Sequence, residues 1–181
     1  MRSVSLFLLF LAVVLTTSNT VSAQTAMVRE VGIRLTGLEN FGFIYKRGIG
    51  EDVYRRYRLF SSSVTYLNTN AGSQGNLGVG AAIGKERRSP LTDRLQFARG
   101  PEFSLSLSAL FAASQTVVNI TPGFGYVLGL VYTINPQFHV SAEVIPSVSV
   151  LITTGNLDVV GFSAGLNSNS VALTAAYRFF K

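Results

Sequence analysis

The chain has 181 residues and no cysteine, and 15 lysines and arginines against 9 aspartates and glutamates give it a net charge of +6. Hydrophobic residues make up 48% of the sequence and charged residues only 13%, against about 25% charged residues in a soluble domain. The absence of cysteine excludes disulfides and a lipid-modified N-terminal cysteine. The surplus of apolar residues predicts that part of the surface contacts a non-aqueous phase.

The N-terminus has the pattern of a secretory signal. Arg2 precedes an apolar run from Leu6 to Leu15, and a polar stretch then leads to small residues that end at Ala23. A charged start, an apolar segment of about ten residues and a small-x-small site are typical of a cleaved signal peptide, whereas a membrane anchor needs about twenty apolar residues. We predict export through the Sec pathway, a signal peptide over residues 1–23 and one domain over residues 24–181.

The rest of the sequence alternates between apolar and small or polar residues, which is the period of a β-strand with two different faces. In chain order, the alternating segments are Val31 to Thr36, Phe41 to Lys46, Arg56 to Ser61, Leu77 to Gly84, Glu102 to Ser108, Gly123 to Tyr132, Phe138 to Val144 and Val171 to Phe179. The longest apolar stretch, Phe124 to Tyr132, is too short for a transmembrane helix. A chain that spans a bilayer without helices must close its strands into a barrel.

Between these segments the composition predicts turns and loops. Polar, glycine-bearing residues from Asn68 to Asn76 predict a long loop, and Lys85 to Arg94 predicts a charged turn. Gly100 and Pro101 predict a bulge near the start of a strand. The alternation changes parity between residues 153 and 170, so a turn or bulge must fall near residues 167–169. This segment is either a long last loop with strand character or a further strand, which leaves the strand count uncertain by one hairpin.

The predicted fold is all-β, a single antiparallel up-and-down transmembrane β-barrel with eight strands. An even number of strands returns the C-terminus to the side on which the chain entered. The alternative is a soluble lipocalin-like barrel or sandwich. That fold would turn the aromatic faces into its core and the glycine and serine faces toward water or a cavity.

The sequence also resembles the small outer-membrane β-barrel proteins of Bacteroidetes-type bacteria, which are similar in architecture to the eight-stranded OmpA and OmpX barrels. The features that carry the resemblance are the signal peptide, the glycine alternation from Leu77 to Gly84, the Lys-Glu-Arg-Arg run after it, the strand start at Gly100-Pro101-Glu102 and the closing Tyr177-Arg178-Phe179. The resemblance implies a porin-like protein in the outer membrane of a Gram-negative bacterium. It implies no shared activity.

The resemblance also gives the last strand a role in assembly. In such barrels this strand is read by the barrel-insertion machinery, and the residues here that match are Leu173, Tyr177 and Phe179. The chain departs from the usual terminal aromatic because Phe180 and Lys181 follow Phe179.

Ten of the 15 basic residues lie between Lys46 and Arg99 and flank two turns at the same end of the predicted barrel. Long basic side chains at a membrane rim reach lipid phosphates at little cost. The residues predicted at the periplasmic rim are Lys46, Arg47, Lys85, Arg87 and Arg88. A docking patch for an anionic partner is the alternative, and nucleic acid is not expected because no binding motif accompanies the charge.

Charged side chains also fall on the predicted inner face of several strands. An eight-stranded barrel is just wide enough to be filled by its own side chains, and charges buried there must be paired. The predicted lumen ion pairs involve Glu30, Arg34, Arg56, Arg58, Glu102 and Glu143. Such a lumen leaves little open pore.

No constellation in the sequence predicts catalysis. His139, Ser141 and Glu143 share one strand face, but residues two apart are separated by about 6.6 Å, too far for a nucleophile and its base. One histidine and no cysteine make no metal cluster, and Gly78 and Gly80 lie in a strand with no following helix that would form a nucleotide loop. We predict no enzymatic activity, no cofactor and no metal.

The predicted function is that of a non-enzymatic integral outer-membrane protein that contacts outer-membrane lipids. Any structural or binding role would be carried by its outer loops, residues 68–76 and 153–169. Two alternatives remain, a small passive outer-membrane channel and a soluble periplasmic lipocalin-like carrier.

Overall fold

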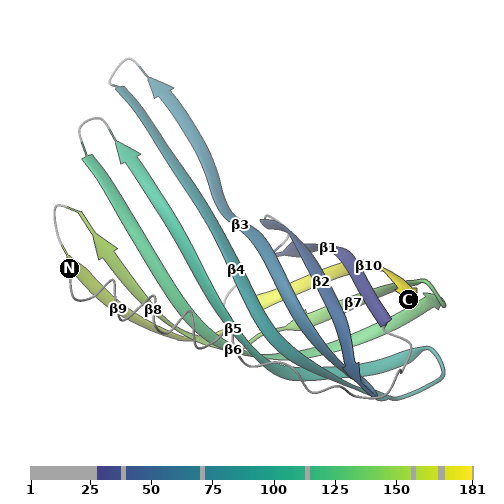
Figure 1. Cartoon of the computed structure of the whole chain (residues 1–181). Coiled ribbons are helices and arrows are strands. Elements are labelled where there is room, and N and C mark those ends of the chain that lie inside the picture. The colour runs from purple at the N-terminus through teal and green to yellow at the C-terminus, as the bar shows by residue number, and fades with distance from the viewer. Residues whose placement is uncertain are drawn as a thin grey trace.

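The computed structural model describes residues 28–37, 40–69, 72–112, 115–155, 158–166 and 170–180, which form ten β-strands (Figure 1). They are β1 (Val28–Thr36), β2 (Asn40–Gly50), β3 (Val53–Thr69), β4 (Gly72–Pro90), β5 (Leu95–Ala112), β6 (Gln115–Asn135), β7 (Phe138–Val144), β8 (Ser147–Thr154), β9 (Val159–Gly165) and β10 (Val171–Phe180). The predicted signal peptide lies outside the described residues. Within these ranges no helix has the length and apolar character needed to cross a membrane.

Eight of the strands close into a ring of antiparallel pairs. Each strand from β1 to β6 pairs with the next, β7 pairs with β10, and β10 pairs with β1. Closure gives every strand of the ring a neighbour on both sides and so removes free edges. The prediction of an all-β, eight-stranded antiparallel barrel is confirmed, and β10 closes the ring on β1, with Leu173 opposite Leu35.

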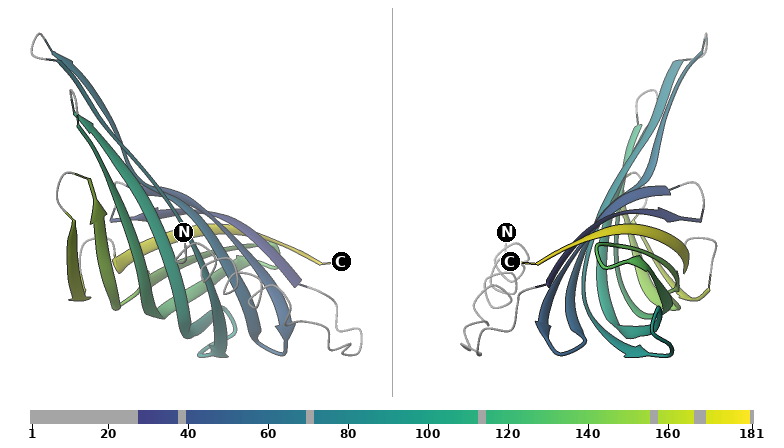
Figure 2. Two further views of the ribbon diagram at one scale, coloured as in Figure 1. Left: turned by 60° about the vertical axis from the view of Figure 1, so that its left-hand side comes forward. Right: turned by 90° about the vertical axis from the view of Figure 1, so that its right-hand side faces the viewer.

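A tall wall rises above one side of this ring. The strands β3 to β6 are 17 to 21 residues long, whereas β1 has 9. The β8–β9 hairpin pairs along the N-terminal half of β6, beyond a break in pairing at Ile145 and Pro146. Three hairpins therefore project on one side, while β1, β2 and β10 form a low rim (Figures 1 and 2).

Two segments that were predicted as connections are strands. Residues 68–76 lie largely in the ends of β3 and β4, and Lys85 to Pro90 belongs to β4, so the turn is only residues 91–94. Cross-strand pairing overrides the loop preference of polar residues, as where Gln74 lies opposite Ala112. Strands β8 and β9 are the further hairpin, and the predicted turn at 167–169 lies outside the described residues.

The predicted bulge at Gly100 is wrong. Strands β4 and β5 keep one register on both sides of this residue, with Gly84 opposite Glu102 and Arg87 opposite Arg99, so no residue is inserted. Gly100 has φ of +157°, and a Cβ there would lie 1.9 Å from the carbonyl oxygen of Lys85. Glycine is required because the two backbones approach too closely for any side chain.

The two faces of the closed ring have opposite chemistry. Along β10, exposed and buried side chains alternate from Val171 to Tyr177, which confirms the predicted facing of this strand. Each of the eight ring strands presents large apolar side chains on the outside. One from each, with exposed fractions between 37% and 64%, are Ile33, Phe43, Leu59, Val79, Phe103, Leu128, Val140 and Leu173.

Candidate functional site

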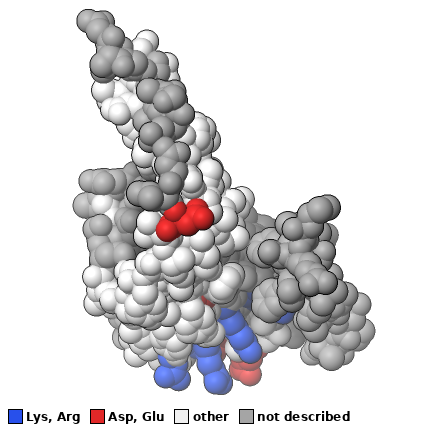
Figure 3. Space-filling model, turned by 90° about the vertical axis from the view of Figure 1, so that its left-hand side faces the viewer, with Lys and Arg blue, Asp and Glu red and all other residues white. Residues whose placement is uncertain are grey.

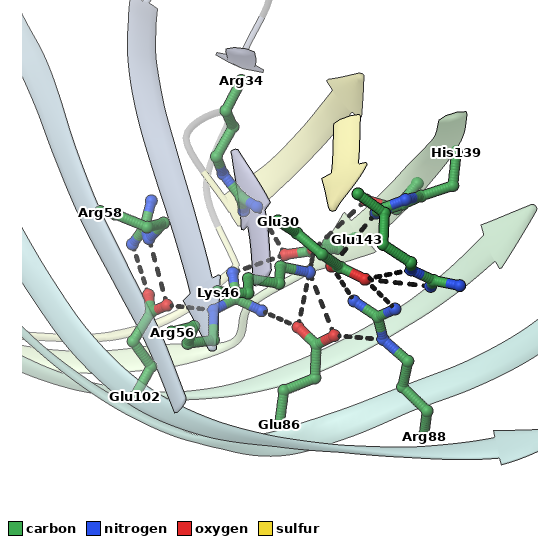
Figure 4. Close-up of polar contacts among 12 residues, drawn as sticks. Glu30, Arg34, Lys46, Arg56, Arg58, Glu86, Arg88, Glu102, His139 and Glu143 are labelled. Carbon is green, nitrogen blue, oxygen red and sulfur yellow. Dashed lines mark hydrogen bonds and ion pairs between the residues drawn. The ribbon is translucent and has the colours of Figure 1, made fainter. Parts of the chain in front are cut away.

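The closed part of the barrel is filled by a network of buried charges, which we call the plug (Figure 4). Four glutamates supply its negative charge: Glu30, Glu86, Glu102 and Glu143. Six cations from β1, β2, β3, β4 and β10 contact them: Arg34, Lys46, Arg56, Arg58, Arg88 and Arg178. The lumen of the ring is thus occupied by side chains from most of its strands.

Glu143 on β7 connects three of these strands. Its Oε2 accepts hydrogen bonds from Arg34 Nη1 at 2.5 Å and from Arg56 Nη2 at 2.8 Å. Its Oε1 lies 3.6 Å from Lys46 Nζ and accepts a bond from Ser141 Oγ at 3.4 Å. One carboxylate therefore neutralises side chains from β1, β2 and β3.

Glu86 holds a second group of cations. Its oxygens accept bonds from Lys46 Nζ at 2.7 Å, Arg56 Nη1 at 2.9 Å and Arg88 Nε at 2.8 Å. Arg56 also contacts Glu143, so the two carboxylates share cations. Shared partners make the plug one connected network rather than a set of separate pairs.

Glu30 completes the network toward the end of the barrel opposite the projecting hairpins. This end holds the turns at residues 51–52, 91–94 and 136–137, and we call it the short-turn end. Arg88 donates to both of its oxygens, at 2.9 and 2.6 Å, in a bidentate pair. Arg178 Nε donates to Glu30 Oε1 at 3.0 Å, and His139 Nε2 lies 3.3 Å from Oε2. This pairing links β1, β4, β7 and β10 across the lumen.

The structure brings together all six residues that the sequence assigned to lumen ion pairs. It also places Lys46 and Arg88 there, 1% and 2% exposed, so their prediction as rim residues is wrong. Buried carboxylates hold both side chains, and Glu86 is the partner that sequence reasoning missed. Glu86 and Arg88 alternate along β4 with Lys85 and Arg87, which point outward. This alternation was the signal that could have placed Glu86 inside the barrel.

Glycines on the inner face make room for the plug. A Cβ at Gly129 would lie 2.8 Å from Glu143 Cγ and 2.9 Å from the Ala142 carbonyl oxygen. We expect Gly129→Ala to lower the free energy of unfolding by about 1–3 kcal/mol, the cost of overpacking, in urea titrations of the folded barrel. Gly50→Ala is the matched control, because nothing lies within 4 Å of a Cβ there; equal losses would contradict the expectation.

The polar residues of β7 contact different carboxylates. His139 lies against Glu30, whereas Ser141 donates to Glu143. His139, Ser141 and Glu143 are all buried. This is the environment of packed interior side chains rather than of side chains that face a substrate. Within the described ranges, no three histidine, cysteine, aspartate or glutamate residues cluster in a way that could hold a metal ion.

Above the plug the lumen widens into a cavity of about 240 Å³, which we call the outer cup. Arg58 and Glu102 line its lower part, where Arg58 donates Nε to Glu102 Oε2 at 3.1 Å and Nη2 to Oε1. Ser104, Gly123 and Ser149 lie in the same cross-strand row as Arg58, because the register pairs each residue of this row with the next on the neighbouring strand. The cup is therefore polar and lies between the plug and the tall wall.

The exterior of the barrel is basic at its short-turn end. The register places Arg29, Arg47, Arg55 and Lys85 directly opposite one another on four adjacent strands, and we call them the basic row. Like charges in direct cross-strand opposition destabilise a sheet. Basic side chains gather at the lower end of the face in Figure 3 with an acidic one beside them, and one acidic patch lies on the otherwise uncharged surface above. An anionic neighbour would offset this repulsion.

An aromatic row lies next to the basic row. Tyr177, Val31, Tyr45 and Tyr57 occupy the adjacent outward position on β10, β1, β2 and β3. The rings of Tyr45 and Tyr57 stack with centroids 6.1 Å apart. Of the predicted rim residues, Arg47, Lys85 and Arg87 are exposed on the outer face at this end.

No protein-family model and no curated protein matches the sequence. Three solved structures are similar: a major outer membrane protein from Thermus thermophilus (14% identity, TM-score 0.48, 86% of this chain and 100% of that chain), Neisserial surface protein A (12%, 0.44, 84% and 94%) and CarO from Acinetobacter baumannii (13%, 0.41, 87% and 98%). They do not support the closer resemblance to Bacteroidetes-type, OmpA or OmpX barrels.

Proposed function

We propose that the chain is an integral outer-membrane protein of a Gram-negative bacterium, exported through the Sec pathway with residues 1–23 removed. The observation that carries the proposal is the inversion of its faces: apolar side chains surround all eight ring strands, while the lumen holds ten charged side chains. A soluble carrier would have its apolar residues inside. An outer-membrane barrel has an apolar outside and a polar inside.

The aromatic and basic rows indicate where one interface of the bilayer would cross the barrel. Tyrosines favour the membrane interface, and basic side chains just beyond them reach anionic headgroups. Both rows lie at the end opposite the three projecting hairpins, where the connections stay close to the ring, as periplasmic turns do in outer-membrane barrels. The tall wall then faces the outside of the cell, and residues 68–76 and 153–169, which lie partly outside the described residues, would carry any surface-binding role.

Heat-modifiable migration tests this proposal. A folded barrel extracted from the outer-membrane fraction resists detergent and should migrate differently on a gel before and after boiling. Recovery of the protein in a periplasmic wash without detergent, with migration unchanged by boiling, would instead establish the soluble alternative.

We expect the lumen not to conduct. The plug fills the ring with connected, buried ion pairs, and an eight-stranded barrel has no further width for a channel. Planar bilayers that contain the folded protein should show no conductance steps at any applied voltage. Steps that appear with the wild-type protein would favour the channel alternative.

The basic row makes a separate prediction about lipid. Each basic side chain near an anionic surface contributes about 1 kcal/mol, so the barrel should unfold less readily in vesicles with phosphatidylglycerol than in phosphatidylcholine alone. Arg55→Gln should reduce this difference by about 1 kcal/mol. Arg94→Gln is the control and should leave it unchanged, because Arg94 lies on the exposed turn after β4, about 20 Å beyond Lys85 along the strand and so farther than the ~10 Å screening length from the row.

We further propose that the protein has no enzymatic activity and that the last strand, with Leu173, Tyr177 and Phe179, is recognised by the barrel-insertion machinery. The outward exposure of Leu173 and Tyr177 supports the second point. Replacing both by serine should slow insertion into vesicles that contain the machinery more than insertion into vesicles that lack it. An equal delay in both would contradict a recognition role.

A further inference from the structure

The outer cup has the size, hydroxyl lining and charge of a ligand site. We propose that it binds a monosaccharide-sized anion, a sugar acid, with the sugar hydroxyls on its serine wall and the carboxylate toward Arg58. The volume of about 240 Å³ is below the ~300–1,000 Å³ typical of drug-sized ligands and suits one ring. This inference goes beyond the membrane role and rests on it only for the statement that the cup opens to the outside of the cell.

The serine wall supplies hydroxyl groups that the described part of the chain leaves without a hydrogen-bond partner. Ser104 and Ser106 on β5 and Ser147 and Ser149 on β8 line the cup, and no residue in the described ranges hydrogen bonds their hydroxyls. Higher on the wall, polar side chains satisfy one another, as in the bond between Thr153 Oγ1 and Asn119 Oδ1 at 2.7 Å. A hydroxyl both donates and accepts, which matches the hydroxyls of a sugar.

Glycines keep the cup open between these serines. A Cβ at Gly123 would lie 3.0 Å from Ser104 Oγ and 3.4 Å from Ser149 Cβ, so both serines flank the bare backbone of β6. The ring of Phe60 forms an apolar part of the lining. It lies against Gly80, where a Cβ would come within 2.4 Å of the ring. Polar groups beside one aromatic surface can hold a ring that has hydroxyls at its edge and C–H groups on its face.

The charge below the cup favours an anion over a neutral sugar. In the described part of the chain, the plug has six arginines and lysines but four glutamates. Glu102, the one carboxylate among the cup's described lining residues, is shared by Arg58 and Arg56. Arg34 leaves its Nε and Nη2 without a hydrogen-bond partner within the same ranges. Uncompensated buried cations are costly, so a carboxylate entering the cup offsets part of this cost.

Isothermal titration calorimetry on the folded barrel in detergent micelles tests the proposal, with glucuronate and glucose as probes. Glucuronate should bind at least about tenfold more tightly than glucose, the effect of one hydrogen bond to a charged group. Ser149→Leu fills the cup without removing a charge and should abolish glucuronate binding. Ser163→Leu, opposite Ser149 on β9 but outside the cup, should leave it unchanged.

Arg58→Gln separates the two parts of the site. This variant should bind glucuronate and glucose with similar, weak affinity, because the serine wall remains and the guanidinium is gone. Where Ser149→Leu fails to fold, Gly123→Ala narrows the same part of the cup by one methyl group and should weaken glucuronate binding.

Three results would overturn the inference: no glucuronate binding by the folded wild-type barrel, equal affinity for glucose and glucuronate, or unchanged affinity after the cup is filled. Heat-modifiable migration and vesicle insertion are measured on the same samples. A barrel that inserts and does not bind refutes only the cup site, whereas a protein that does not insert refutes the membrane role.

Discussion

Glu143→Gln should lower the free energy of unfolding by about 3–5 kcal/mol, the cost of breaking a buried ion pair from one side. The amide removes the negative charge that Arg34, Arg56 and Lys46 share, while all three cations stay inside the ring. Glu86 already contacts Lys46 and Arg56 and cannot replace the lost charge. Urea titration of the folded barrel in vesicles measures the loss.

Glu51→Gln is the matched control for this experiment. This substitution removes the same charge from the exposed turn between β2 and β3. A substitution at such a position changes the free energy of unfolding by no more than about 0.5 kcal/mol. If the two variants were equally stable, the plug would not contribute to folding and the inner charges would have to be compensated by water.

Leu173→Arg should cost about 2–4 kcal/mol, because it places a charge on the lipid face near the bilayer midplane. Leu173 lies on the outside of β10, paired with Leu35 on one side and Ala142 on the other. It is four residues above Tyr177 in the aromatic row, about 13 Å along the strand, which places it deep in the apolar band. Equilibrium unfolding from vesicles gives the value.

Val64→Arg provides the comparison for lipid exposure. Val64 is 73% exposed on the upper half of β3, beyond the part of that strand that pairs with β2, so it belongs to the wall that projects above the ring. A charge outside the hydrocarbon costs about 0–1 kcal/mol. Equal effects of the two substitutions would contradict the proposed position of the bilayer.

The alternation of apolar and polar residues was enough to predict the closed part of the barrel. Period 2 is a local property of each strand, and it assigns residues such as Leu173 and Glu143 to opposite faces without knowledge of their neighbours. The number of ring strands followed from the same pattern. Composition, by contrast, misassigned residues 68–76 and 85–90, because polar strands that are held by their pairing have the composition of loops.

In the lumen, too, some residues could be predicted from local alternation and others depended on distant partners. Six members of the plug could be predicted because their inward parity was clear, but Lys46 and Arg88 were assigned to the rim for their charge and position beside turns. Their burial depends on Glu86 and Glu30, which lie 40 and 58 residues away in sequence. A carboxylate partner at that separation is chosen by the strand register and not by local sequence.

By itself, the sequence determined that strands with one apolar face form an antiparallel barrel, and which face of each strand is apolar, because facing depends only on the alternation along a strand. Tertiary structure alone decided the tall one-sided wall, the outer cup and the basic row. These features depend on how far each hairpin extends and on which residues the register places opposite one another. Arg29, Arg47, Arg55 and Lys85 are scattered in the sequence and become neighbours only when the ring closes.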